Sequence, residues 1–265
     1  MAKTDENGIK IYDAADFEGM RKAGRLAAEC LDYITDYVTV GVTTEELDDL
    51  CHKFITSHNA IPACLGYHGY PKTICTSINH VICHGIPDDR KLEEGDILNI
   101  DVTVIVDGWY GDTSRMYYVG KPKLKATRLC DVTYECLMRG IDVVRPGARF
   151  GDIGAVIEEY AHKYGYSVVE MFCGHGLGKV FHDEPNVLHY GKKVEVTDDC
   201  EFNFNPVIWG GGSSDDALHC PRVISSNGDC NNRESLLTVV KDNVFTNRFM
   251  FVKAEIVDGF TSPLP

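Results

Sequence analysis

The sequence predicts an α/β (α+β) fold made of two similar halves, each with two helices followed by strands. Three observations support this prediction. The chain begins with two segments of helical apolar spacing, continues with two β-branched runs joined by a tight turn, and repeats this order after Lys125. Its 265 residues are enough for a full core in one large domain or in two tightly joined halves.

The first half is expected to open with two amphipathic helices. Between residues 16 and 38, apolar residues recur at the three-to-four-residue spacing that gives a helix one buried face. The second helix is expected to begin at Thr43, because Glu46 completes the pattern of a capping box. A strand-rich segment over residues 72–83 then leads into the two β-branched runs.

Those two runs predict a hairpin around the dipeptide Asp107-Gly108, because a two-residue hairpin turn needs positive φ at both central positions. Pairing outward from this turn places Thr103 opposite Asp112. Asp101 then lies on the same sheet face as Asp112, as a diagonal neighbour at roughly 7–8 Å. The hairpin therefore brings two carboxylates together inside an apolar element.

Two adjacent carboxylates in such a hairpin repel one another and lose hydration unless a positive group lies between them. A hard divalent metal ion would supply that group. The alternative is that one aspartate caps a turn while the other is solvated. The hairpin alone leaves both interpretations open.

The second half repeats the first with an offset of 106 residues. The tripeptide Glu-Cys-Leu at residues 29–31 recurs at 135–137, and Gly41 corresponds to Gly147. A duplicated half-domain would give a pseudo-twofold axis, a curved and mostly antiparallel sheet, and a concave face at the junction. Chance alignment of a few residues is the alternative.

We expect a mobile segment over residues 1–12 and a single domain over 13–265, with halves at about 16–120 and 125–265. Beyond a strand at 166–172, closing strands are expected at 202–209, 238–244 and 248–257.

Composition argues against several functional classes. The net charge of −14 disfavours binding to nucleic acid or to an anionic membrane surface, which both need clustered Lys and Arg. The chain starts without the apolar core of a signal peptide, and no apolar run is long enough to span a membrane. Eleven cysteines without a Cys-x-x-Cys pair favour a reducing, cytoplasmic location. We expect a monomer.

A histidine-containing segment at residues 173–185 is the second feature that suggests chemistry. Three glycines surround His175 and let the backbone pass close to another group, and His182 follows seven residues later. Most single histidines have a structural role, so the surrounding glycines are the reason to consider a functional role for His175.

Three stretches, in matching order and spacing, resemble the type 1 methionine aminopeptidases. They are residues 70–87, the hairpin with its two aspartates, and residues 173–185, and the resemblance runs from about residue 12 to 191. It implies the pita-bread fold, a duplicated α/β half with a pseudo-twofold axis. It also implies removal of N-terminal methionine from peptides and nascent proteins by a metallohydrolase that holds two divalent ions of the Co, Mn, Fe or Zn class.

The resemblance assigns a role to each matching residue. Asp101 would chelate one metal ion, Asp112 would bridge two, and His175 would bind the second. His84 and His182 would face the scissile amide and stabilise the transition state. The methionine side-chain pocket would be lined by Cys64, Tyr67, Tyr70, Cys75 and Phe181.

The chain departs from the family pattern at two positions. The family has metal-binding glutamates where this sequence has Asn205 and Met250. Their loss halves the negative charge that offsets two divalent ions, and a thioether is too soft for Mn, Fe(II) or Co(II). At most one loosely held ion is then expected, with Asn205 a weak candidate ligand.

Two other functions remain open at this point. The chain could be a catalytically impaired or inactive pseudo-aminopeptidase that binds peptide N-termini or a protein partner. It could also be a prolidase or creatinase relative, which is disfavoured because those chains carry a long extra N-terminal domain, whereas the first helix here is expected near residue 16.

Overall fold

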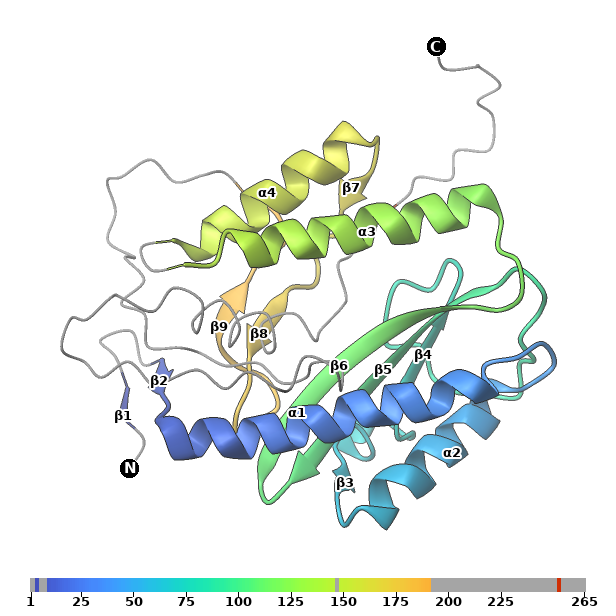
Figure 1. Cartoon of the computed structure of the whole chain (residues 1–265), viewed down its shortest axis with the longest axis horizontal. Helices are drawn as coiled ribbons and strands as arrows, with labels where there is room; N and C mark the ends of the chain where they lie inside the picture. The colour runs from blue at the N-terminus through green and yellow to red at the C-terminus, as the bar shows by residue number, and fades with distance from the viewer. Residues whose placement is uncertain (1–2, 5–8, 146–147, 192–251, 254–265) are drawn as a thin grey trace.

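The computed structural model describes residues 3–4, 9–145, 148–191 and 252–253 (Figure 1). The strands expected at 202–209 and 238–244 lie outside these ranges. No helix in the described part of the chain is both long enough and apolar enough to cross a membrane.

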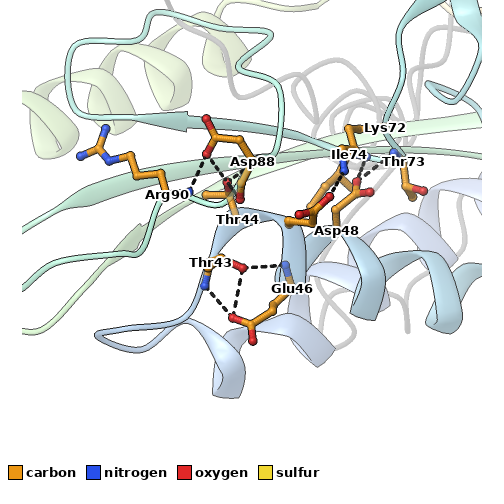
Figure 2. A network of polar contacts seen from close by, with 10 residues as sticks. Thr43, Thr44, Glu46, Asp48, Lys72, Thr73, Ile74, Asp88 and Arg90 are labelled. Carbon is orange, nitrogen blue, oxygen red and sulfur yellow. Dashed lines mark hydrogen bonds and ion pairs between the residues drawn. The ribbon is translucent and has the colours of Figure 1, made fainter.

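Two helices open the first half, as predicted. Helix α1 (Ala14–Ile34) continues into the 3-10 turn η1 (Thr35–Tyr37), and α2 (Thr44–Ser57) follows. The capping box expected for α2 is confirmed: the Thr43 Oγ1 accepts from the Glu46 N–H at 3.1 Å, and the Thr43 N–H donates to Glu46 Oε2 at 2.8 Å (Figure 2). These contacts satisfy amides that a helix N-terminus otherwise leaves unpaired.

The sheet of the first half has β5 (Ile97–Val106) at its centre. Strand β6 (Trp109–Tyr118) pairs along one edge of β5, while β3 (Ile61–Pro62) and β4 (Cys75–Ile78) pair with successive parts of its other edge, all antiparallel. The predicted hairpin register is confirmed.

Strand β4 is shorter than the strand-rich segment expected over residues 72–83. The chain turns at Asn79 (φ 52°) and again at His84 (φ 54°), and such left-handed residues end a strand.

Helix α1 packs closely on β5 and β6. The core between them is closed to solvent and includes Met20, Leu31, Ile34, Leu98, Ile100 and Val102. At Gly111 of β6 an added Cβ would overlap the backbone of Ala23 and Gly24 in α1. Strand and helix are therefore in backbone contact at this point.

The second half contains a second helix pair and short strands. Helices α3 (Leu124–Asp142) and α4 (Phe150–Lys163) lie side by side in Figure 1. They are followed by β7 (Ser167–Val168), β8 (Gly174–Gly176) and β9 (Asp183–Val187), with β8 and β9 paired. The bounds of α4 are those of α2 shifted by the 106-residue offset of the sequence repeat.

Two further strand pairs are described. Near the N-terminus, β1 (Lys3–Thr4) pairs with β2 (Lys10–Ile11), and Lys10 forms an ion pair with Asp183 at 2.6 Å. Strand β10 (Val252–Lys253) pairs with β7 and falls within the closing strand expected at 248–257.

Candidate active site

A cavity of about 820 Å³ is lined by both halves of the chain. The ten described residues with a predicted site role all line it: Cys64, Tyr67, Tyr70, Cys75, His84, Asp101, Asp112, His175, Phe181 and His182. Asn205, the weak candidate ligand, and Met250 lie outside the described residues.

Asp101 and Asp112 lie buried on neighbouring strands, 7% and 4% exposed. Strand pairing sets Thr103 opposite Asp112, and the Thr103 hydroxyl donates to Asp112 Oδ1 at 2.9 Å. Within the described ranges the buried Oδ1 of Asp101 has no hydrogen-bond partner. Burial, together with the charge of Asp112, raises the pKa of Asp101 well above its ordinary value. A cation between these carboxylates would relieve both effects.

His175 is held on β8 facing the carboxylates. Its Nδ1 lies 3.0 Å from the Gly176 carbonyl, which can only accept, so Nδ1 carries the proton. In the neutral ring the lone pair is then on Nε2, which lies 3.7 Å from Asp112 Oδ2. Gly176 permits this arrangement, because a Cβ there would overlap the Glu184 backbone on β9.

These three side chains suit a hard divalent ion, since carboxylate oxygens and an imidazole nitrogen face one cavity and one buried oxygen lacks a partner. Within the described ranges, however, no group of three or more His, Cys, Asp or Glu side chains could hold an ion by itself. The described residues thus supply one wall of a metal site rather than a closed cage.

Of the four other histidines that line the cavity, His84 and His182 are the two with a predicted role. His182 Nδ1 lies 2.9 Å from the Tyr67 hydroxyl, and the His182 ring centroid is 4.3 Å from that of His175. Burial, followed by the neighbouring His175, lowers the pKa of His182 to about 4. Burial also lowers the pKa of His84, whose ring meets Phe172 edge-on at 5.4 Å. Both rings are therefore neutral at pH 7 and able to exchange a proton or a hydrogen bond with an amide.

An apolar slot adjoins these histidines. The Phe181 ring stacks on Tyr110 at a centroid distance of 5.5 Å and is tilted against Tyr67 at 4.7 Å. Cys64 packs into the same cluster, and such a sulfur- and aromatic-lined slot suits a thioether. The sequence prediction missed Tyr110 and Phe172. Neither has a local sequence signal, because each joins the site only through packing of distant segments.

Buried His189 should make stability depend on pH. Burial lowers its folded-state pKa to about 4, below the unfolded value of 6.5. The unfolded state therefore binds more protons between these values, and this contribution to stability is lost as pH falls from 6.5 toward 4. At about pH 5 we expect a loss of about 2 kcal/mol relative to pH 7.5. Urea unfolding of wild type and His189→Leu at both pH values measures the contribution of His189 to this loss. If stability changes equally with pH in the two proteins, the prediction is wrong.

Comparison with known proteins decides the family. The model of metallopeptidase family M24 matches residues 18–223, more than three quarters of the chain. This chain belongs to metallopeptidase family M24. Membership implies a divalent metal cofactor. The match extends beyond residue 191, where the long described stretch ends.

Two similar relatives carry the same name. A methionine aminopeptidase of Rickettsia prowazekii (strain Madrid E) is 60% identical over 206 residues, covering 77% of this chain and 80% of the relative. The methionine aminopeptidase of Escherichia coli (strain K12) is 50% identical over 208 residues, covering 77% and 79%. The resemblance to methionine aminopeptidases is thereby confirmed.

Solved M24 structures confirm the pita-bread fold. The crystal structure of methionine aminopeptidase from Rickettsia prowazekii matches with a TM-score of 0.68 and 62% identity, covering 72% of this chain and 75% of that one. The enzyme from Thermotoga maritima matches with a TM-score of 0.67 and 32% identity, over the same shares. A Xaa-Pro dipeptidase from Bacillus anthracis, at 20% identity, a TM-score of 0.62 and 69% and 51% coverage, shares the fold.

Proposed function

We propose that this chain removes the N-terminal methionine from peptides and nascent proteins with the help of a divalent metal ion. The observation that carries the proposal is the single cavity that gathers the buried carboxylates of Asp101 and Asp112, the imidazoles of His84, His175 and His182, and an apolar, sulfur-containing slot. Relatives at 50–60% identity that are named methionine aminopeptidase support it. The proposal includes a cytoplasmic monomer that binds neither nucleic acid nor membrane.

Asp101, Asp112 and His175 are the residues that would hold the metal. An ion of the Co, Mn, Fe or Zn class supplies Lewis acidity there, lowering the pKa of water and polarising a carbonyl. We propose one ion on this wall rather than the two of the family, because Asn205 is a weak ligand and Met250 a poor one for such metals.

The remaining residues would bind and orient the substrate. Phe181, Tyr67 and Cys64 form an apolar surface for the methionine side chain. The contact with the Tyr67 hydroxyl orients the His182 ring. Both His182 and His84 are neutral at pH 7 because their pKa values are lowered. Each can therefore donate a hydrogen bond toward the scissile amide as charge develops on it.

The test is hydrolysis of a Met-Gly-type peptide by the full chain with added Co(II) or Mn(II). Turnover should depend on metal, stop with chelator, and fall for an Ala-Gly peptide because the slot is left unfilled. A folded protein with metal and no turnover above background would contradict the proposal.

The second candidate is a pseudo-aminopeptidase that holds peptide N-termini without cleaving them. The presence of Asn205 and Met250 at the two glutamate positions favours it. Elemental analysis separates the candidates: less than one tightly bound ion per chain, together with peptide binding but no cleavage, would favour the binding protein.

A further inference from the structure

Helix α2 holds one short segment of the chain, residues 72–74, through three polar side chains. Glu45, Asp48 and His52 follow one another at three- and four-residue spacing, so they share one face of the helix. Their contacts, in the same order, are Glu45 Oε1 with Lys72 Nζ at 2.6 Å, Asp48 Oδ1 with the amides of Thr73 and Ile74 at 2.8 and 2.9 Å, and His52 Nδ1 with Thr73 Oγ1 at 2.8 Å.

Figure 2 shows Asp48 beside the backbone of Thr73 and Ile74, and its contacts are the strongest of the three. Its side chain is buried, 6% exposed, and a single carboxylate oxygen accepts both backbone amides. Hydrogen bonds from amides to a buried charge contribute more than neutral ones, and removing the acceptor leaves two buried donors unpaired. The Glu45–Lys72 pair is partly solvated and contributes little.

The held segment is continuous with the walls of the cavity. Cys75 follows it directly, and Tyr70 precedes it; both line the cavity. The Tyr70 hydroxyl lies 3.0 Å from the Ile74 carbonyl and 3.0 Å from the Gly85 carbonyl. Ile74 therefore binds Asp48 through its N–H and Tyr70 through its C=O, so the position of the Tyr70 ring depends on the position of Asp48.

We propose that Asp48 is a positioning residue that fixes the Tyr70 and Cys75 walls of the cavity and thereby sets affinity and selectivity for the N-terminal side chain of the substrate. The proposal deepens the proposed function and rests on it. Asp48 lines no part of the cavity and acts only through residues 73–74.

Two substitutions separate the hydrogen bonds of Asp48 from its charge. Asp48→Ala removes the acceptor of both amides, whereas Asp48→Asn keeps an Oδ1 acceptor in the same place and removes only the charge. For Asp48→Ala we expect KM for a Met-Gly-type peptide to rise about tenfold with kcat within about twofold, and the preference for Met over Leu at the N-terminus to fall about tenfold. Asp48→Asn should stay within about threefold of wild type.

The matched control is Thr43→Ala on the same helix. It removes the N-cap of α2, which destabilises the helix, and touches none of residues 72–74. A loss of folded protein lowers apparent kcat and leaves KM unchanged. A rise in KM with Asp48→Ala, absent with Thr43→Ala and restored by Asp48→Asn, therefore reports positioning.

Amide hydrogen exchange tests the same link without peptidase activity. In Asp48→Ala the amides of Thr73, Ile74 and Thr76 should exchange faster than in both wild type and Thr43→Ala. Unchanged exchange at these amides, or wild-type KM and selectivity in Asp48→Ala, would overturn the proposal. Absence of turnover in the wild type would instead contradict the proposed function, and exchange would still decide the role of Asp48.

Discussion

Asp112→Ala is expected to lower kcat/KM for a Met-Gly-type peptide by about 10³-fold and to abolish the binding of Mn(II) or Co(II). Asp112 lines the cavity together with Asp101 and His175, and its Oδ2 lies 3.7 Å from His175 Nε2. Its removal takes away one of the two carboxylates that would hold the metal. A loss of about 4 kcal/mol of transition-state stabilisation corresponds to this factor, since each 1.36 kcal/mol is tenfold in rate.

Thr103→Val is a milder change at the same carboxylate, to be compared with Asp112→Ala. It removes the hydroxyl that donates to Asp112 Oδ1 and keeps the carboxylate, so we expect a loss of about 10- to 100-fold. Steady-state kinetics and calorimetric titration with Mn(II) measure both variants. If Asp112→Ala binds Mn(II) as wild type does, Asp112 is not a ligand and the proposed metal site is wrong.

Gly111→Ala is expected to destabilise the fold by about 3 kcal/mol or more, the upper end of what overpacking costs. The added methyl group would overlap the backbone of Ala23 and Gly24, which cannot move aside as a flexible side chain can. Helix α1 would have to shift from β6, opening the core around Met20 and Leu31. The measurement is the free energy of unfolding in urea or the shift in Tm.

Gly174→Ala is the control for Gly111→Ala, because its added methyl group would lie 3.4 Å from the Val187 Cβ, an ordinary contact. We expect a change of less than about 1 kcal/mol there. If the two substitutions lowered the free energy of unfolding equally, the close contact between α1 and β6 would not limit the size of the residue at position 111.

The parts of the fold that follow from local sequence could be predicted in detail. The Asp107-Gly108 turn has φ of 52° and 82°, and this turn fixed the register that places Thr103 opposite Asp112. The capping box at Thr43 is equally local. The bounds of α4 agree with those of α2 shifted by the 106-residue offset found in the sequence.

Nonlocal contacts could not be predicted from the sequence. The short length of β4 depends on left-handed residues at Asn79 and His84, which nothing in their residue types requires. The hold of Asp48 on Thr73 and Ile74 joins residues 25 and 26 positions apart. Only the folded chain brings such groups together.

The ten described residues of the candidate site were predicted from sequence motifs and from family resemblance, because contacts between distant residues cannot be read from the sequence. Their common cavity is a finding of the structure. Their individual roles stay predictions, as do the effects of Asn205 and Met250, which lie outside the described residues.

The division of the site between the halves has a consequence for synthesis of the protein. Asp101 and Asp112 belong to strands β5 and β6, whereas His175 and His182 come from the later segment that contains β8. A ribosome releases the carboxylates some sixty residues before the imidazoles. With the roles proposed for these residues, the growing chain cannot catalyse the reaction until its second half has emerged and packed against the first. Onset of activity in timed translation therefore marks the completion of folding.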